Sequence, residues 1–217
     1  MPQPGPRVCD TVLELVAARG PRCGPVSLVI IDGPAGSGKT TLAAQLLREA
    51  GQRGTGSAIV HMDDLYAGWH GLRAGGATLT QLLGQVAAGE PGRYQRFDWH
   101  REVFADWVEI PRAELLIVEG VGSARTEHLQ LASALVWVCE SSAGERLRRG
   151  LARDGGEMQS QWRGWMRDEQ ELFAQVGAAA RADVWVDGTG NIRPACRGTG
   201  WLVGEPDGPL PADVAKS

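Results

Sequence analysis

The chain has 217 residues, of which 43% are hydrophobic, enough for one α/β domain with a full core and too few for two. Its formal net charge of −4 gives no overall positive field for a nucleic acid polymer, and its four cysteines include no CxxC pair that would suggest zinc or a disulfide framework. Because no apolar run approaches the roughly 20 residues of a membrane span, we expect a cytoplasmic protein with no membrane contact.

The first part of the chain predicts a helix, a strand, a glycine-rich loop and a second helix. Apolar residues at helical spacing indicate a short helix over residues 11–18, which ends at Gly20. Residues 26–31 form a nearly continuous run of branched apolar side chains, typical of a strand buried on both faces of a parallel sheet. This strand leads directly into the glycine-rich loop, and leucines at helical spacing predict a helix from Lys39 to about Ala50.

Strands and helices alternate through the rest of the chain. Further strands are predicted at residues 57–62, 115–118, 135–138 and 184–186, and further helices at 79–86, about 143–153 and about 158–176. This alternation predicts an α/β fold with a doubly wound parallel sheet of five strands flanked by helices. We expect a lead-in helix within residues 1–25, one catalytic domain over 26–188 and an irregular tail over 189–217.

The segment GPAGSGKT, from Gly33 to Thr40, has the spacing of a phosphate-binding P-loop. Backbone N–H groups in such a loop converge on the β-phosphate, while Lys39 neutralises β- and γ-oxygens and the Thr40 hydroxyl binds magnesium. The expected ligands are ATP and Mg²⁺, although the sequence does not distinguish ATP from GTP. The nucleotide-binding residues are predicted to be Gly33, Pro34, Ala35, Gly36, Ser37, Gly38, Lys39, Thr40 and Thr41.

Acidic residues follow two other predicted strands, where ligands of open α/β sheets collect. The segment HMDDLY ends the strand at 57–62, and a carboxylate there can accept the proton of an incoming hydroxyl or bind magnesium through water. We choose Asp63 for this role, with Asp64 as its competitor. Glu119 directly follows the strand at 115–118, which suits a second anchor for magnesium, so the predicted metal ligands are Thr40, Asp63 and Glu119.

These segments, together with the basic run RLRRGLARD, resemble the uridine kinase family of P-loop nucleoside kinases, whose cousins include phosphoribulokinase and bacterial pantothenate kinase. The resemblance covers roughly residues 26–188 and implies the P-loop NTPase fold with a helical lid over about residues 146–165. It also implies that the base is Asp63. The lid arginines implied to stabilise charge on the transferring phosphoryl group are Arg146, Arg149 and Arg153.

The acceptor half of the predicted site departs from this family. Phe97-Asp98-Trp99 resembles an aromatic–Asp–aromatic segment of the family, in which the first aromatic is commonly tyrosine. The family's acidic stretch that holds the acceptor sugar corresponds here to AGWHGLRAGG, which has no carboxylate, and GGEMQSQWRGW replaces the arginine-rich continuation of the lid. The expected acceptor-binding residues are Asp63, Tyr66, Trp69, Tyr94, Phe97, Asp98, Trp99 and His100, with Trp162 and Trp165 also at the rim.

The predicted activity is transfer of the γ-phosphate of ATP to a hydroxyl of a small molecule. A nucleoside, uridine or cytidine, ranks first because of the resemblance, with a nucleoside monophosphate, a vitamin precursor or a sugar derivative as alternatives. A nucleotide-dependent switch or regulatory ATPase is the competing class, but no NKxD segment is present. The intact Lys39, Thr40, Asp63 and Glu119 argue against a nucleotide-binding module without turnover. The oligomeric state, homo-oligomers included, is left open.

Overall fold

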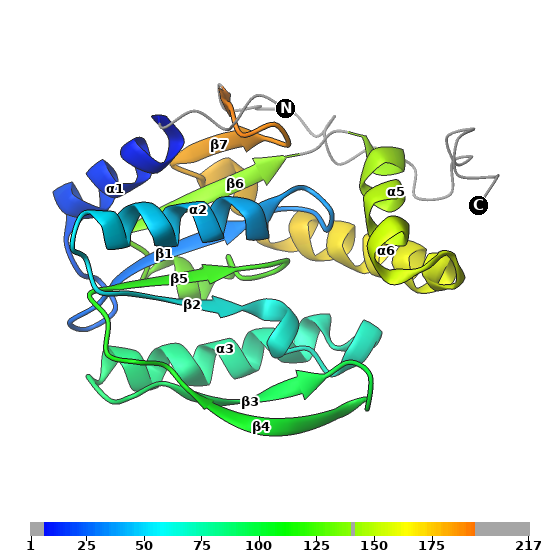
Figure 1. Ribbon diagram of the computed structural model, residues 1–217, viewed down its shortest axis with the longest axis horizontal. Helices are drawn as coiled ribbons and strands as arrows, with labels where there is room; N and C mark the ends of the chain where they lie inside the picture. The colour runs from blue at the N-terminus through cyan, green and yellow to red at the C-terminus, as the bar shows by residue number, and fades with distance from the viewer. Residues whose placement is uncertain (1–6, 140–141, 194–217) are drawn as a thin grey trace.

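A mostly parallel sheet lies at the centre of the computed structural model, which describes residues 7–139 and 142–193 (Figure 1). The strand order is β2-β5-β1-β6-β7-β8, and the first five strands are parallel. The strands are β1 (Ser27–Asp32), β2 (Ser57–His61), β5 (Leu115–Glu119), β6 (Ala134–Cys139), β7 (Val184–Asp187) and β8 (Ile192–Arg193). The doubly wound parallel sheet predicted from the apolar runs is therefore confirmed.

The short strand β8 corrects the predicted count of five strands. It pairs antiparallel with β7 at the edge of the sheet, within the segment expected to be irregular. The Asp187 carboxylate turns the chain between the two strands, because its Oδ1 accepts the backbone N–H groups of Thr189 and Asn191 at 3.0 and 2.9 Å. The rest of the predicted tail, residues 194–217, lies outside the described residues.

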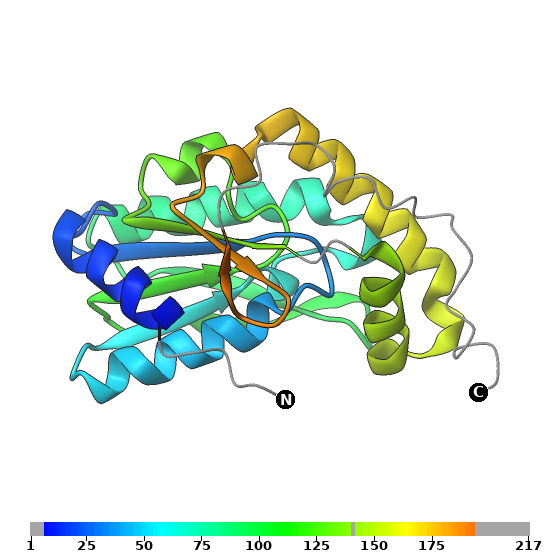
Figure 2. The same cartoon turned by 90° about the horizontal axis from the view of Figure 1, so that it is seen from above.

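Helices cover both faces of the sheet, as the view from above shows (Figure 2). Side chains alternate along each strand, so in β1 Val29 and Ile31 pack toward α1 and α2, whereas Leu28 and Ile30 pack toward α3 and α6. The helices are α1 (Arg7–Arg19), α2 (Lys39–Gln52), α3 (Leu72–Ala87), α4 (Thr126–Leu129), α5 (Ala143–Asp154) and α6 (Gln159–Val176). Among the described residues, no helix combines the length and apolar character needed to cross a membrane.

An antiparallel hairpin, β3 (Arg93–Asp98) and β4 (Val103–Glu109), lies beside α3 and apart from the main sheet (Figure 1). The sequence analysis predicted no strand in this region. The reason is its composition: only Tyr94 and Phe97 of β3 are buried, and most of β4 is exposed, so the hydrophobic pattern is weak. The turn of this hairpin carries Trp99 and His100 toward the carboxyl ends of the main strands.

Helix α3 begins at Leu72, well before the predicted start at residue 79. Gly75 and Gly76 lie in its first turns, and glycine weakens the helical signal in a sequence. Gly75 is required by packing, because a Cβ atom there would lie 2.6 Å from Cδ1 of Tyr66. The Tyr66 ring cannot move easily, since it is fully buried and its hydroxyl donates to the Val121 carbonyl at 2.6 Å.

We predict opposite effects of alanine at two glycines of α3. Gly75→Ala should destabilise the protein by about 1 to 3 kcal/mol, since the new methyl group overlaps the fixed Tyr66 ring. Gly84→Ala is the matched control, because nothing lies within 4 Å of its Cβ position, and it should stabilise the helix by about 0.5 to 1 kcal/mol. Urea unfolding measures both, and equal stability of the two variants would contradict the packing argument.

Candidate active site

The phosphate loop leaves β1 at Asp32 and enters α2 at Lys39, so its N–H groups lie at a helix N-terminus. Two of its glycines are required by close contacts as well as by backbone conformation. Gly33 has φ of 144°, and a Cβ there would lie 2.1 Å from the Val138 carbonyl oxygen. Gly36 has φ of 77°, and a Cβ there would lie 2.8 Å from the Arg146 carbonyl oxygen. The sheet and α5 thus fix the path of the loop.

The buried Asp32 carboxylate joins this loop to the loop that follows β5. It accepts three backbone hydrogen bonds, from Gly33 at 2.6 Å, Gly122 at 3.0 Å and Ala124 at 2.8 Å. Burial raises the pKa of Asp32 to about 6, and these hydrogen bonds oppose the rise. Asp32 was not predicted as a site residue, although a carboxylate at the end of a buried apolar strand is a usable signal in the sequence.

The Glu119 carboxylate contacts two other side chains of the site, Thr40 and His61. Its Oε1 accepts a hydrogen bond from the Thr40 hydroxyl at 3.0 Å and lies 2.7 Å from Nδ1 of His61. His61 and Glu119 are direct neighbours because β2 and β5 pair in parallel register at these residues. The hydrogen bond to Glu119 raises the pKa of His61. His61 was not predicted as a site residue, because the pairing of its strand is not visible in the sequence.

Asp63 and Asp64, which the sequence left in competition, have different surroundings in the 3₁₀ helix η1 (Met62–Asp64). Asp63 is open to the cleft, and its pKa is raised by desolvation and then by the charge of Glu119, whereas Lys39 and Arg153 lower it. Asp64 accepts a hydrogen bond from the Tyr94 hydroxyl at 3.0 Å. A carboxylate with a raised pKa in a cleft suits a general base, and this favours Asp63.

The oxygen atoms of Thr40, Asp63 and Glu119 suit Mg²⁺, which prefers hard oxygen ligands. All three residues line the same cleft. Among the described residues, no cluster of three or more His, Cys, Asp or Glu side chains is arranged to hold a metal by itself.

Two of the three predicted lid arginines line the cleft. Arg149 donates to the Gly36 carbonyl at 3.3 Å, and Arg153 makes two hydrogen bonds to Asp154, at 2.7 and 3.0 Å. Arg146 does not line the cleft, contrary to its expected position, because its side chain is only 4% exposed and pairs with Glu169. The predicted lid, about residues 146–165, corresponds to α5, the 3₁₀ helix η3 (Gly156–Met158) and the start of α6. Its movement stays a prediction.

The buried ion pair of Arg146 and Glu169 connects both of these helices to the phosphate loop. The Arg146 Nη1 atom lies 2.7 Å from Glu169 Oε1, while Glu169 Oε2 accepts the Ala35 N–H at 2.8 Å. Burial raises the pKa of Glu169, and the charge of Arg146 opposes that rise. Glu169 was not predicted, since only the tertiary structure brings α6 to the phosphate loop.

The side of the cleft predicted to bind the acceptor is lined by aromatic side chains. Trp69, from the 3₁₀ helix η2 (Gly68–His70), lies with its ring centroid 5.7 Å from that of Trp99, 6.0 Å from Trp162 and 6.2 Å from Trp165. Trp69, Trp99 and His100, all predicted for this site, line the cleft together with Trp162 and Trp165. Tyr66 also belongs to its wall, but it is fully buried and packs against Trp165 with ring centroids 4.9 Å apart. The structure therefore brings these predicted residues together.

Three other predicted acceptor residues do not line the cleft. Phe97 is buried and packs against Trp99 and Phe104, with ring centroids 5.5 and 5.2 Å away. Asp98 ends the strand by accepting the N–H groups of His100 and Arg101, both at 3.0 Å, and these bonds lower the pKa of its carboxyl. Tyr94 is bonded to Asp64. These residues support the hairpin, and only Trp99 of the Phe-Asp-Trp segment reaches the cleft.

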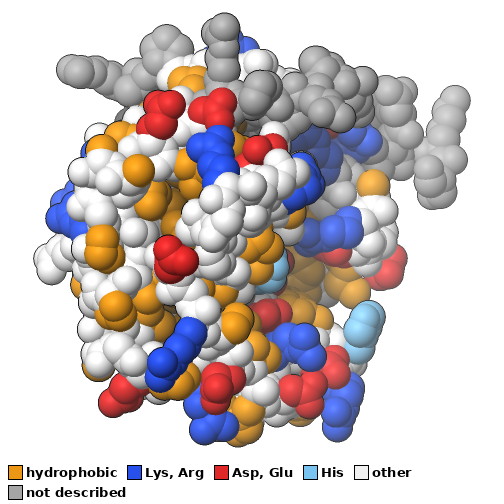
Figure 3. All heavy atoms as spheres, turned by 60° about the vertical axis from the view of Figure 1, so that its left-hand side comes forward, with side chains coloured by type: hydrophobic (Ala, Val, Ile, Leu, Met, Phe, Trp, Pro, Cys, Tyr) orange, Lys and Arg blue, Asp and Glu red, His pale blue; other side chains and the backbone are white. Residues whose placement is uncertain are grey.

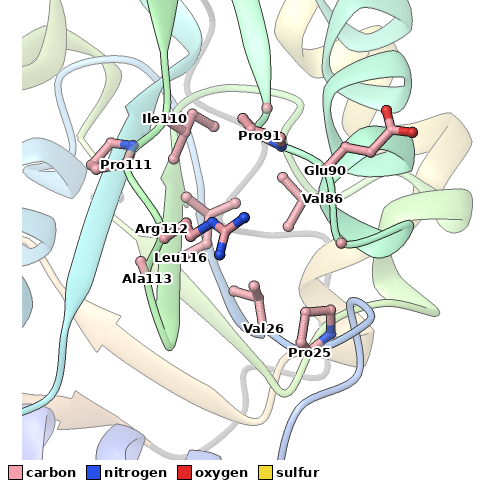
Figure 4. Close-up of a pocket in the computed structure, with 12 residues that line it drawn as sticks. Pro25, Val26, Val86, Glu90, Pro91, Ile110, Pro111, Arg112, Ala113 and Leu116 are labelled. Carbon is pink, nitrogen blue, oxygen red and sulfur yellow. The ribbon is translucent and has the colours of Figure 1, made fainter.

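The cleft has a volume of about 900 Å³ and opens between the phosphate loop, α5, α6 and the hairpin turn. The space-filling view shows a recess with hydrophobic side chains in its depth and charged side chains around its rim (Figure 3). A smaller pocket of about 240 Å³ lies at the opposite end of the sheet, between the end of α3 and the segment before β5 (Figure 4). That second pocket contains none of the predicted site residues.

Comparisons with solved structures show the fold. The chain is 21% identical to a possible uridine kinase from Bacillus stearothermophilus, covering 82% of this chain and 97% of that one with a TM-score of 0.60. It is also 21% identical to a protein of Silicibacter sp. TM1040 described as a fructose transport system kinase, with 80% and 87% covered and a TM-score of 0.50. A third structure, the YGR205w protein, is 13% identical, with 86% and 96% covered and a TM-score of 0.53.

The fold is thus shared with P-loop kinases along most of the chain. No family model matches the sequence, and no curated protein matches it either. At these identities the likeness establishes the architecture, and the chemistry has to be inferred from the residues of the cleft.

We predict that Lys39→Ala abolishes phosphoryl transfer and preserves the fold. In the structure, Lys39 Nζ donates to the Pro34 carbonyl at 2.8 Å, so the substitution removes one hydrogen bond and costs about 1 kcal/mol of stability. The lost charge should lower turnover by about 10² to 10³. Circular dichroism and a steady-state assay test this prediction. A folded variant that keeps more than about a tenth of wild-type turnover, a loss below about 1.4 kcal/mol, would contradict the assigned triphosphate site.

We predict a large loss of stability in Glu169→Gln, of about 3 to 5 kcal/mol, because it leaves the buried Arg146 guanidinium without a counter-charge. The double variant Arg146→Met with Glu169→Gln should regain most of this loss, since the amide oxygen can still accept the Ala35 N–H. Urea unfolding measures the stability of both variants, and the KM for ATP shows whether the phosphate loop is disturbed. If Glu169→Gln unfolds at the same urea concentration as the wild type, the ion pair does not hold the loop.

Proposed function

We propose that this protein is an ATP-dependent phosphotransferase that transfers the γ-phosphate to a hydroxyl of a small molecule. The observation that carries the proposal is the position of Asp63, a cleft carboxylate with a raised pKa, in the same cleft as Lys39 and Thr40 of the phosphate loop. A general base and a triphosphate-binding loop on one cleft are the two parts that this reaction needs.

In the proposed reaction, the backbone N–H groups of the phosphate loop and the Lys39 ammonium hold the triphosphate. Asp63 accepts the proton of the acceptor hydroxyl, whose oxygen forms a bond to the γ-phosphorus as the bond from that phosphorus to the β,γ-bridging oxygen breaks. The γ-phosphoryl group is transferred and ADP leaves. Arg149 and Arg153 stabilise the negative charge of the transferring group. Magnesium, held by Thr40 and Glu119 and approached by Asp63, would neutralise the phosphate oxygens.

The size and lining of the cleft favour a kinase over a switch that only hydrolyses nucleotide. The cleft extends from the phosphate loop to Trp69, Trp99 and His100, which leaves room for a second substrate beside the triphosphate. Solved structures with this fold include proteins described as kinases, which supports the same class of reaction. A nucleoside is the first candidate acceptor, and a nucleoside monophosphate, a vitamin precursor or a sugar derivative are the alternatives. We place the reaction in the cytoplasm, where ATP is available.

We predict that Asp63→Asn lowers kcat by about 10² to 10⁴ and changes ATP binding far less, because an amide cannot accept the acceptor proton. Asp64→Asn is the matched control and should keep kcat within about tenfold of wild type, since Asp64 is bonded to Tyr94. In the wild type, kcat should fall as the pH drops through the pKa of Asp63, which lies above the ordinary value of 3.8 for this carboxyl. Asp63→Asn should lack this acidic limb.

Steady-state ADP release with a panel of hydroxyl acceptors measures these effects. ADP release that depends on an acceptor supports the kinase, and slow release independent of any acceptor would support the switch. If Asp64→Asn loses activity while Asp63→Asn keeps it, the base is the neighbouring residue.

A further inference from the structure

The charges that line the cleft are unevenly distributed. Its lysine and arginine side chains are Lys39, at the start of α2, and Arg149 and Arg153 of α5. Among the described residues, the parts of the cleft wall that come from η1, η2, the hairpin turn, η3 and α6 contribute no lysine or arginine. The lysine and arginine groups therefore serve the triphosphate, and His100 is the one basic side chain that the described residues place at the acceptor end.

The same acceptor end carries negative charge. Asp64 and Glu157 line it, and Glu157 is exposed and has no hydrogen-bond or ion-pair partner among the described residues. Arg153 lies beside this end, with its guanidinium carbon 5.8 Å from the Trp162 ring centroid, but its charge is already matched by two hydrogen bonds to Asp154. An anionic acceptor would meet these carboxylates and the bound triphosphate without a free cation.

Indole faces form the other surface of the acceptor end. The ring planes of Trp99 and Trp162 are inclined to that of Trp69 by 76° and 63°, so these indoles meet edge to face and do not stack flat on one another. The indole N–H groups of Trp99 and Trp162 already have partners, because Trp99 Nε1 donates to the Asp63 carbonyl at 2.9 Å and Trp162 Nε1 donates to Asp154 at 3.0 Å. Indole faces beside carboxylates attract cations, and the energy is largest for tryptophan.

From this arrangement we infer that the acceptor is a hydroxyl compound with a protonated amine and a flat or apolar body. The inference rests on the proposed function, since it assumes that the acceptor binds between Asp63 and the indoles. The apolar body contacts Trp69 and Trp99, the amine lies near Glu157 and Asp64, and the hydroxyl reaches Asp63. Of the acceptor classes considered above, this disfavours nucleoside monophosphates and acidic vitamin precursors, and it ranks amine-bearing acceptors above neutral nucleosides.

The test uses three probes with one skeleton and different charges: 4-(aminomethyl)benzyl alcohol, 1,4-benzenedimethanol and 4-(hydroxymethyl)benzoate. Their affinities for the full chain with saturating MgADP are measured by calorimetry. The amine should bind about tenfold more tightly than the neutral diol and about 100-fold more tightly than the carboxylate. Glu157→Gln should reduce the affinity of the amine by about three- to tenfold and leave that of the diol unchanged.

Glu90→Gln is the matched control, because it removes the same charge at the far end of the sheet, where the carboxylate points away from the second pocket (Figure 4). It should leave all three affinities unchanged. Equal affinities for the three probes, tighter binding of the carboxylate, no binding of the amine up to about 10 mM, or equal effects of Glu157→Gln and Glu90→Gln would each overturn the inference.

Measurements of ADP release on the same protein distinguish a failure of this inference from a failure of the proposed function. If ADP release depends on an acceptor but anionic acceptors react as well as amines, the kinase assignment stands and the charge preference is wrong. If ADP release is independent of every acceptor, the proposed function fails, whatever the order of the three affinities.

Discussion

The parallel register of β2, β5 and β1 is the constraint on which the site depends. Ile31 pairs with Glu119, and Glu119 pairs with His61, so the three strands end at one level. The residues that follow them, the phosphate loop, the Gly120 loop and η1, therefore meet at one edge of the sheet. A shift of β2 by one residue would turn His61 to the other face of the sheet. The contact between His61, Glu119 and Thr40 is a consequence of this register.

Two buried carboxylates at this edge of the sheet link separate segments of the chain through hydrogen bonds. Asp32 joins the phosphate loop to the loop after β5, and Glu169 joins the same loop to α5 and α6 through Arg146. Asp32 accepts three buried backbone N–H groups, each of which would cost about 1 to 3 kcal/mol if left without a partner, and Glu169 accepts the Ala35 N–H. The position of the phosphate loop is thus set by three separate parts of the chain, although its sequence motif is local.

The sequence was sufficient wherever the determining interactions are local. The apolar runs at β1, β5 and β6 identified buried strands, and the glycine spacing identified the phosphate loop with Lys39 and Thr40. Arg146, Arg149 and Arg153 could not be told apart, since all three belong to one basic helix and only the packing of α6 buries the first of them. The hairpin was missed because most of its side chains are exposed. Asp63 and Asp64 could be told apart only in the folded protein, where Asp63 is open to the cleft and Asp64 accepts a hydrogen bond from Tyr94.

The two halves of the cleft differ in how they are built, and this suits the difference between a phosphate loop that matches the motif of the uridine kinase family and a predicted acceptor segment that departs from it. The triphosphate half uses backbone N–H groups and a short motif, which tolerate little change. The acceptor half is assembled from η1, η2, the hairpin turn, η3 and α6, each of which contributes one or two side chains. Substitutions there can alter the acceptor without disturbing the phosphates. Because Trp69 contacts both Trp99 of the hairpin and Trp162 of α6, a ligand that packs on Trp69 would lie against the hairpin and α6 at once.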